Sequence, residues 1–227
     1  MTTTPLSPTP RTDVGRGRNR MVEDRAELHR LLEDALIAHL GVTVSRDGVS
    51  HPLVLPTAYA VDLDGPDLDG TLYLHGSVAA GWLRAATDTT VCVTITELDG
   101  LVAARSAFHH SMNYRSAVVI GAARLVDDPA ERGHALDLIV DHMIPGRSVT
   151  LRANTRKELA ATAVLALPLH EASMKSRDEG PVDEPGDIDA GVWGGVIPLR
   201  RMAGEPVAAE DATGPVPADV VRRAASL

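Results

Sequence analysis

Cysteine is almost absent from this chain of 227 residues, and Cys92 is the only one. One thiol cannot close a disulfide within the chain, and it cannot supply a zinc site that needs several cysteines. Cys92 lies in a run of β-branched residues, which favours a buried, unreactive thiol. We therefore expect a cytoplasmic protein that is stabilised by its hydrophobic core.

Long apolar runs and an excess of positive charge are absent as well. No apolar stretch approaches the roughly 20 residues that span a membrane, and the first 20 residues lack the apolar run of an export signal. The chain has 22 Lys and Arg against 31 Asp and Glu, a net charge of −9. Such a balance disfavours a nucleic-acid surface built on bulk positive charge. We expect neither a membrane nor a nucleic acid as a partner.

The residues that are present describe one globular domain with two polar ends. Hydrophobic residues make up 44% of the sequence, enough for one well-buried core. Residues 1–20 contain three prolines and little to bury, which predicts a flexible N-terminal arm. Residues 201–227 are rich in Ala and Pro and are predicted to form a C-terminal tail. The folded domain is expected over residues 21–200.

Between these ends, short strand-like runs alternate with turns and a few helical segments. We predict strands over residues 36–44, 49–61, 71–74, 89–96, 101–105, 117–126 and 163–175, and helices over 23–32, 78–86 and 129–143. Hairpin turns are predicted at 46–48 and at Asp99–Gly100. Asp128 with Glu131 predicts the start of the helix at 129–143, and Thr155 with Glu158 predicts the capping box of a further short helix. No strand–helix–strand unit repeats, which disfavours the parallel-sheet nucleotide folds. The pattern predicts a mainly β protein with α insertions, whose antiparallel strands close into a small barrel.

The segment 72–86 is where we expect a ligand to bind. His75, Gly76 and Ser77 follow a short strand and precede the predicted helix at 78–86. Gly76 allows another group to approach the backbone closely, Ser77 can cap the helix, and the free N–H groups of a helix start attract anions. The sequence therefore predicts a phosphate site at this junction.

The adjacent histidines His109 and His110 do not predict a metal site. Neighbouring side chains on a strand point to opposite faces, so the two imidazoles would not share one ion. No third histidine or carboxylate follows at the spacing of metal ligands. We expect no metal ion at this pair.

Four motifs resemble a known family. They are YLHGS at 73–77, ARSAFHHSMNYRS at 104–116, MKSRDEGP at 174–181 and VWGGVIPL at 192–199. In this order they resemble the pyridoxamine 5′-phosphate oxidase-like superfamily, and within it the flavin-nucleotide-binding proteins related to nitroimidazole-resistance proteins. The resemblance spans about residues 20–200. It implies an antiparallel split β-barrel that forms a homodimer and holds two FMN molecules in the interface.

The resemblance also implies which residues touch the cofactor. These are His75, Gly76, Ser77, Arg84, Ser106, Asn113, Tyr114, Arg115, Ser116, Lys175 and Trp193. Arg84 and Arg115 are the candidate phosphate cations, since a guanidinium binds phosphate bidentately. Three of these residues also have purely structural interpretations. Arg84 could be an exposed helix residue, Lys175 could form a surface ion pair, and Trp193 could be part of the core.

Two classes of function follow from the resemblance. The first is an FMN-dependent oxidoreductase acting on a small planar substrate, with a transient nicotinamide donor and with His75 or Tyr114 handling protons. The second is a non-catalytic binder of FMN or of another planar cofactor, a haem or a deazaflavin, with His109 or His110 as the axial haem ligand. His75 has a structural alternative beside the cofactor. Pyridoxamine phosphate oxidation is disfavoured, because GGVIPL follows Trp193 where the genuine oxidases carry an arginine-bearing segment.

Overall fold

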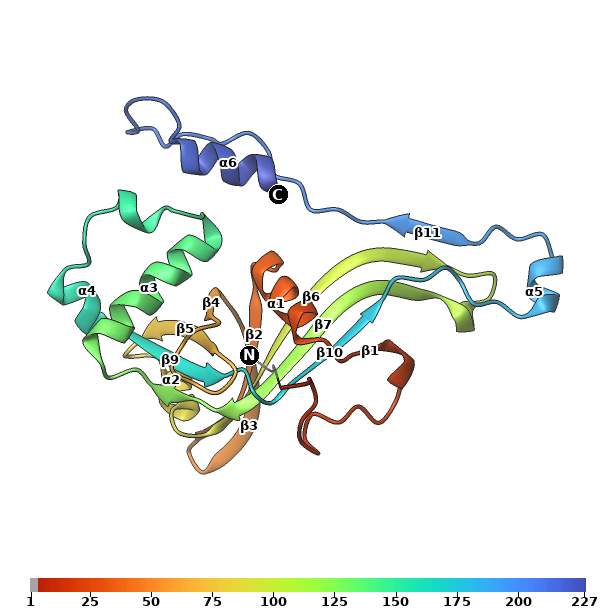
Figure 1. Cartoon of the computed structure of the whole chain (residues 1–227), viewed down its shortest axis with the longest axis horizontal. Helices are drawn as coiled ribbons and strands as arrows, with labels where there is room; N and C mark the ends of the chain where they lie inside the picture. Colours follow the sequence, from red (N-terminus) through yellow and green to blue (C-terminus); the bar gives the residue numbers. More distant parts are fainter. Residues whose placement is uncertain (1–3) are drawn as a thin grey trace. The chain divides into compact units, whose positions relative to one another are not determined.

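The structure is a computed structural model that describes residues 4–227, and antiparallel strands form the larger part of its regular secondary structure (Figure 1). The chain forms two compact units. The first comprises residues 4–35, 94–119 and 171–200, and the second comprises 36–93, 120–170 and 201–227. Strands β6 (Thr90–Ala103) and β7 (Ser111–Ala122) begin in one unit and continue in the other. The predicted fold class, mainly antiparallel β with helical insertions, is confirmed.

The first unit is a sheet with the strand order β1-β10-β7-β6, and β11 pairs with the other edge of β6. Its further elements are β1 (Met21–Val22), β10 (Ala172–Arg177), β11 (Gly195–Pro198), the short helix α5 (Pro185–Asp189) and the 3-10 turns η1 (Arg18–Arg20) and η2 (Ala107–His109). Every pair is antiparallel, with Lys175 opposite Ser116 in the register. Helix α5 and strand β11 lie near the end of the sheet where β6 connects to β7 (Figure 1).

Helix α1 (Arg25–Asp34) forms where its apolar spacing predicts it. The Asp24 side chain caps the helix by accepting a hydrogen bond from the Ala26 N–H at 2.9 Å. Leu28, Leu31 and Leu32 recur at helical spacing and are fully buried. The apolar face of this helix is therefore part of the core.

The N-terminal segment was predicted to be a flexible arm, and its residues 1–3 lie outside the described residues. In residues 4–20 the structure places a chain that runs beside β10. The Ser7 N–H donates to the Ala172 carbonyl at 2.7 Å, the Thr9 hydroxyl donates to Glu171, and Leu6 and Thr12 are buried. Flexibility of the arm stays a prediction, and these contacts give residues 4–20 a defined course.

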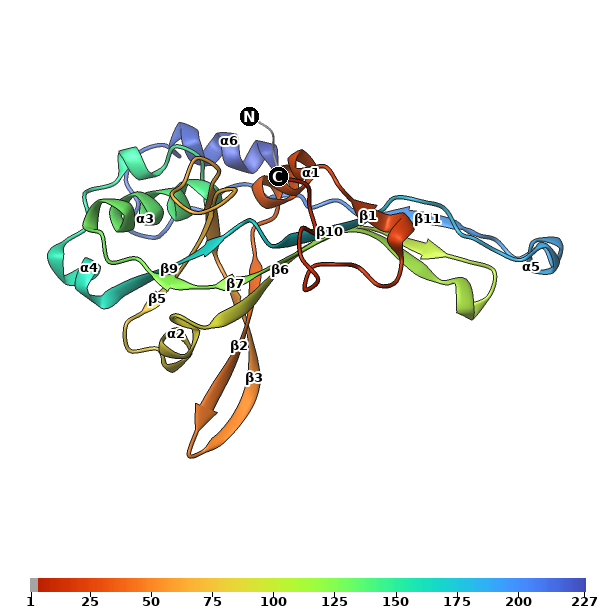
Figure 2. The same cartoon turned by 60° about the horizontal axis from the view of Figure 1, so that its bottom comes forward.

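The second unit contains a four-stranded antiparallel sheet and a long hairpin. The sheet has the order β4-β5-β9-β8, with β4 (Tyr59–Asp62), β5 (Thr71–Ser77), β9 (Thr162–Pro168) and β8 (Arg124–Leu125). The hairpin pairs β2 (Ala38–Arg46) with β3 (Val49–Thr57) and extends well out from its neighbours (Figure 2). Asp47 and Gly48 both have positive φ, as a tight hairpin turn requires, so the turn predicted there is confirmed.

Helices cover the four-stranded sheet. Helix α3 (Pro129–Met143) starts at Asp128, whose carboxylate accepts from the Glu131 N–H at 2.8 Å. Ala135 and Ile139 on α3 pack with Tyr73 and Val164 of the sheet in one core cluster. The remaining helical elements are α4 (Arg156–Ala161), with the predicted Thr155–Glu158 capping box, η3 (Ser148–Thr150) and α6 (Ala218–Ser226).

Several predicted boundaries are wrong. The strands expected over 49–61 and 117–126 are each divided in two, the first into β3 and β4 and the second into β7 and β8. Three further corrections have a clear physical cause. The strand expected over 163–175 is two strands, β9 and β10, because Pro168 cannot donate and the next residue bonds outside the strand, Leu169 N–H to the Gly70 carbonyl at 2.9 Å. The turn expected at Asp99–Gly100 is absent, and β6 runs straight through it. Gly100 instead leaves room for β11: a Cβ there would lie 3.1 Å from Val196 Cγ1. The third correction concerns α2 and is given with the site.

The strand orders of the two sheets do not close into a ring within residues 4–227. In the same residues no helix combines the length and the apolar character that crossing a membrane requires. The strands that position the site thus belong to two antiparallel sheets: a seven-stranded sheet with the order β1-β10-β7-β6-β2-β3, in which β11 also pairs with β6, and the four-stranded sheet β4-β5-β9-β8.

Candidate functional site

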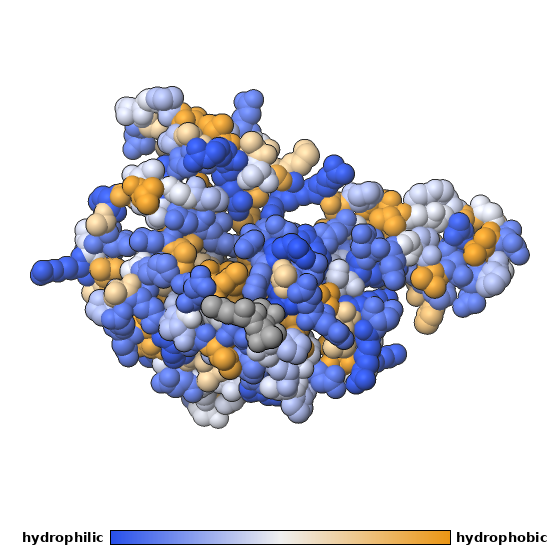
Figure 3. Space-filling view, viewed as in Figure 1, coloured by the Kyte–Doolittle hydropathy of each residue, from blue (hydrophilic) through white to orange (hydrophobic). Residues whose placement is uncertain are grey.

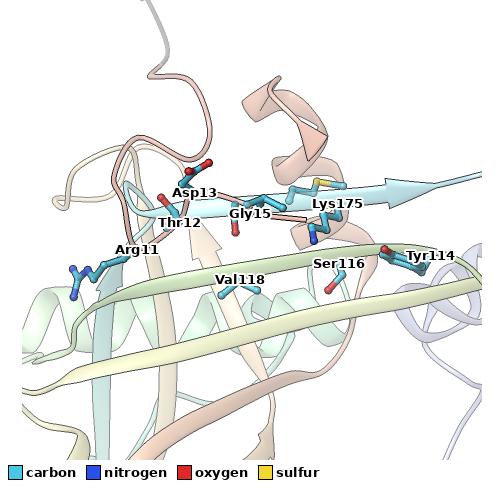
Figure 4. Close-up of a pocket in the computed structure, with 11 residues that line it drawn as sticks. Arg11, Thr12, Asp13, Gly15, Tyr114, Ser116, Val118 and Lys175 are labelled. Carbon is cyan, nitrogen blue, oxygen red and sulfur yellow. The ribbon is translucent and has the colours of Figure 1, made fainter. Parts of the chain in front are cut away.

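A pocket of about 480 Å³ opens in the first unit between the N-terminal segment and the strands β7 and β10 (Figure 4). Its walls come from three stretches of chain that are far apart in the sequence: Arg11, Thr12, Asp13, Val14 and Gly15, then Tyr114, Ser116 and Val118, then Ser173, Met174 and Lys175. Three of the predicted cofactor residues, Tyr114, Ser116 and Lys175, thus line one cavity.

Strand geometry explains why these residues meet. Side chains two apart on a strand share a face, so Tyr114, Ser116 and Val118 of β7 point to one side. In the antiparallel register Lys175 of β10 lies directly opposite Ser116. Cross-strand partners of this kind have their side chains side by side on the same face. The pairing of β7 with β10 therefore assembles the pocket wall.

The pocket offers the Lys175 ammonium and several hydroxyl groups. The Lys175 ammonium donates one hydrogen bond, to the Arg16 carbonyl at 2.9 Å, and an ammonium has three protons to donate. The Ser116 hydroxyl lies 3.0 Å from that of Thr96. In Figure 4 the side chains of Lys175, Ser116 and Tyr114 gather at one end of the cavity. Arg11, at the other end, is paired with Glu171. Such a wall suits a ligand with phosphate or carbonyl oxygens.

Arg115, predicted to bind phosphate, is held by two carboxylates. Its guanidinium donates to Asp34 at 2.7 Å and in a bidentate manner to Asp99 at 3.1 Å. The hydrogen bonds to Asp99, with those to Asp34, raise the pKa of Arg115 above its ordinary value, against the effect of burial. Residue 115 follows Tyr114 directly on β7, so it faces away from the pocket wall. The phosphate role of Arg115 stays a prediction.

Asn113, predicted to bind the ring edge, is buried and already engaged. Its Oδ1 accepts hydrogen bonds from the Arg177 guanidinium and from the Glu179 N–H. Arg177 in turn donates to the carbonyls of Glu179 and Gly180. Asn113 therefore fixes the course of the chain after β10, and its contact with a cofactor stays a prediction.

Ser106 and Trp193 lie towards the far ends of β6 and β7. The Ser106 hydroxyl is buried and has no hydrogen-bond partner among residues 4–227. The Trp193 side chain is 67% exposed, and its ring lies against Gly195, where a Cβ would come within 2.7 Å. An indole exposed to this extent is not part of the core of this chain.

The junction after β5 differs from the predicted phosphate site. Strand β5 continues through Ser77, and helix α2 (Gly81–Ala86) begins only at Gly81, with Ala80 as its N-cap and no side-chain cap. The Ser77 hydroxyl accepts from the Ala79 N–H at 3.2 Å, within the turn. The predicted cap is therefore wrong. Binding of the cofactor by Gly76 and Ser77 stays a prediction.

Gly76 is required by packing, and a substitution tests this. A Cβ at Gly76 would lie 2.6 Å from Cζ2 of Trp82, so Gly76→Val must displace the indole. We expect a loss of about 1–3 kcal/mol in the free energy of unfolding, measured with urea. Gly81→Ala is the matched control, because nothing lies within 4 Å of a Cβ there. Equal stability of the two variants would refute this explanation of Gly76.

Two other predicted residues line separate hollows of the second unit. Arg84 lies in the last turn of α2 and borders a surface hollow together with Arg46 and His51. His75 borders a pocket of about 400 Å³ beneath α3 and α4. Burial lowers the pKa of His75 below its ordinary value, which favours the neutral imidazole.

Comparison with known proteins identifies the family. A sequence model of the family described as pyridoxamine 5′-phosphate oxidase matches residues 24–176, more than half of the chain. The chain belongs to this family. The resemblance found in the sequence is thereby confirmed. The residues that match the pyridoxamine 5′-phosphate oxidase family include Tyr114, Ser116 and Lys175. A comparison with curated protein sequences found no match.

Two solved structures share the fold over nine tenths or more of this chain, and a third shares it over about two thirds. The flavocytochrome Anf3 from Azotobacter vinelandii is 34% identical, with a TM-score of 0.85, over 96% of this chain and 98% of that one. An FAD- and haem-binding protein from Mycobacterium smegmatis is 39% identical, with a TM-score of 0.80, over 90% and 97%. A candidate 5-nitroimidazole antibiotic resistance protein from Bacteroides thetaiotaomicron, 24% identical with a TM-score of 0.55 over 68% and 85%, shows the fold alone.

The N-terminal wall of the pocket was missed by the sequence analysis. Arg11, Thr12 and Asp13 stand in a Pro- and Thr-rich stretch with no periodic apolar pattern. Their order comes from partners far along the chain, such as Glu171, and a local pattern holds no signal of such contacts. The apolar stripe on α3 beside His75, in contrast, is visible in the sequence as helical spacing.

Proposed function

We propose that this chain is a flavin- and haem-binding oxidoreductase of the pyridoxamine 5′-phosphate oxidase family. One observation carries the proposal: the similarity to the flavocytochrome and to the FAD- and haem-binding protein extends over 96% and 90% of this chain, at 34% and 39% identity. The family model by itself reaches only residues 24–176. The likeness to these two proteins therefore extends well beyond the share of the chain that the family model matches.

The flavin site in this proposal is the pocket of Tyr114, Ser116 and Lys175. Its volume of about 480 Å³ lies in the range of cofactor sites, and its ammonium and hydroxyl groups suit the phosphate and ring oxygens of a flavin nucleotide. FMN was predicted from the sequence. The relative with 39% identity is named for FAD, so we propose the dinucleotide.

A second copy of the chain is part of the same proposal. In the first unit, large apolar side chains around α5 and β11 are exposed, and Figure 3 shows some of them at the surface (orange). They are Leu101, Phe108, Met112, Val182, Ile188, Val192, Trp193 and Ile197, with Phe108 89% exposed. Large exposed apolar side chains that gather in one part of a fold are typical of interaction surfaces. We expect a homodimer, the split β-barrel of the family, with the flavin at the interface.

The chemistry divides between the cofactors and the chain. A bound flavin accepts a hydride from a donor such as a nicotinamide, and a haem carries single electrons. The residues of the chain bind and orient. Lys175 attracts the anionic tail, the Ser116 hydroxyl offers a hydrogen bond, and Tyr114 can hold or donate a proton at its phenolic oxygen. A small planar electron acceptor remains the proposed substrate.

The composition of the purified protein tests the proposal. We expect absorption near 450 nm from flavin together with a sharp Soret band from haem, and we expect the mass of the released flavin to be that of FAD. A nicotinamide donor should bleach the flavin band, and an oxidant should restore it. A protein that stays colourless after incubation with FAD, FMN and haem would overturn the proposal. Cofactors that bind but never undergo reduction would indicate a storage or sensing protein.

A further inference from the structure

A second pocket, in the second unit, has an apolar wall against which a flat ring system could pack. Its volume is about 400 Å³, and the wall is a stripe of α3 with the spacing i, i+3, i+4, i+7. The apolar lining residues are Leu136, Ile139, Val140 and Met143 of this stripe, together with Val149, Leu151, Ala153 and Leu159, and the polar lining residues are His75, Asp137, Ser148, Arg152, Asn154, Glu158 and Thr162. Cofactor sites in proteins are concave and combine apolar walls with polar groups that fix the orientation of the ligand.

Three polar residues of the lining, Arg152, Glu158 and Ser148, are held by hydrogen bonds. Arg152 donates to Glu158 at 2.9 and 2.6 Å, and Ser148 donates to Asp141. Met143, Val149 and Leu151 expose 43%, 86% and 48% of their surface. A bound apolar ligand would remove part of this surface from water, which is the main source of affinity for such ligands.

His75 borders the same pocket because of the pleat of β5. It stands two residues after Tyr73, so both side chains lie on the face that α3 covers, and it pairs with Val164 of β9. The buried Nδ1 of His75 has no hydrogen-bond partner among residues 4–227. A buried polar atom without a partner is rare and calls for an explanation.

We propose that His75 is an axial ligand of the haem iron and that the pocket beneath α3 and α4 holds the macrocycle. This inference rests on the proposed binding of haem. Proximal histidine is a common haem ligand, and the apolar stripe of α3 provides the wall that a porphyrin face requires.

The other histidines considered for haem are less suited. His110 lies with its Nδ1 2.9 Å from the Ser106 carbonyl, and its side chain is exposed to solvent. His109 packs edge-on against Phe108 and lies 3.8 Å from Glu184. Neither borders one of the two pockets described above. The assignment therefore differs from the axial ligands expected from the sequence.

The test compares His75→Ala with His134→Ala after reconstitution with haem. His134 is the matched control, since it lies on α3, pairs with Asp62 and does not line the pocket. We expect His75→Ala to lose haem affinity by more than the roughly 10- to 100-fold that removal of an outer-shell partner costs. Haem per chain, the Soret position and flavin content are measured, and added imidazole should restore the Soret band.

The outcomes separate the inference from the proposed function. Unchanged haem content and an unchanged Soret band in His75→Ala would overturn the assignment while the proposed function stands. A wild-type protein that takes up no haem would overturn the haem part of the proposed function itself. If His75→Ala fails to fold, the wild-type protein is treated with diethyl pyrocarbonate with and without haem, and carbethoxylation of His75 is measured by peptide mass. We expect haem to protect His75. Equal modification in both samples would refute the assignment.

Discussion

Lys175→Glu should lower the affinity for flavin by about 100-fold, because loss of a charge-assisted hydrogen bond and the new repulsion together are worth roughly 2–3 kcal/mol. Lys175 supplies the ammonium in the pocket of Tyr114 and Ser116, and its register on β10 fixes it there. A flavin nucleotide carries at least one phosphate, so the substitution replaces attraction by repulsion. The measurement is a titration of the apoprotein with FAD, followed by quenching of flavin fluorescence.

The chain offers a matched control in Lys157, the only other lysine. It lies exposed on α4, and Lys157→Glu changes the net charge by the same amount. We expect its affinity for FAD to equal that of the wild type. Equal weakening in both variants would mean that net charge, not the pocket, governs binding. Because Lys175 also binds the Arg16 carbonyl, the far-ultraviolet circular dichroism of Lys175→Glu is compared first, and Lys175→Gln serves as the neutral variant.

Arg124→Met should lower the free energy of unfolding by about 2–3 kcal/mol. The Arg124 guanidinium donates to Asp67 at 2.8 Å and to Glu131 at 2.5 Å, and the Tyr73 hydroxyl donates to the same Glu131. The carboxylate side chains are 14% and 18% exposed. Without the guanidinium they would stay partly buried without a counter-charge. Water reaches Arg124, which keeps the loss below that of a fully buried pair.

Urea unfolding at pH 7 measures this loss. Arg152→Met is the control, since Arg152 makes a comparable bidentate contact with Glu158 on the surface, where solvent screens the pair. We expect the control to unfold with the wild type within error. Equal losses in the two variants would show that the burial of Asp67 and Glu131 contributes nothing.

The same cluster predicts how stability depends on pH. Burial by itself would raise the pKa of Asp67, but hydrogen bonds from Arg124 and Thr71 outweigh it, so that the pKa lies below its ordinary value. A depressed pKa adds stability above the unfolded value of about 3.9 and loses it as the pH falls further. The wild type should therefore lose more stability below about pH 4 than Arg124→Met does. Burial and the bond to Glu131 raise the pKa of Tyr73 to about 12, so Tyr73 stays neutral there.

Much of the fold could be predicted from local patterns. The apolar spacing of 28–32 gave α1, Asp128 with Glu131 gave the start of α3, and Asp47–Gly48 gave the hairpin turn. The four family motifs were recognisable because they lie in order along the chain. Predicted element boundaries were wrong where the contact that sets the boundary comes from a distant part of the chain. Strand β11 packs against Gly100, where a turn was expected, and the Leu169 N–H at the end of β9 donates to the carbonyl of Gly70.

The site was only partly within reach of the sequence. The family motifs predicted that Tyr114, Ser116 and Lys175 contact the cofactor. The register of β7 with β10 places these three residues on one wall of the pocket. Prediction from sequence could not show that residues 11–15 close the pocket, because Thr9 and Arg11 take their order from Glu171. The sequence analysis also placed Ser77 at the start of a helix. In the structure Ser77 is the last residue of strand β5, Trp82 packs on Gly76, and helix α2 begins only at Gly81.

The sequence by itself determined the family, the antiparallel β character, the caps of α3 and α4 and the residue types available for binding, because these depend on neighbours along the chain. Only the tertiary structure decided which of those residues meet. It brought Lys175 to Ser116 across a strand pair and left His75 beside the apolar stripe of α3. Which side chains come into contact depends on strand register and on packing between residues far apart in the chain, and no local sequence pattern encodes either.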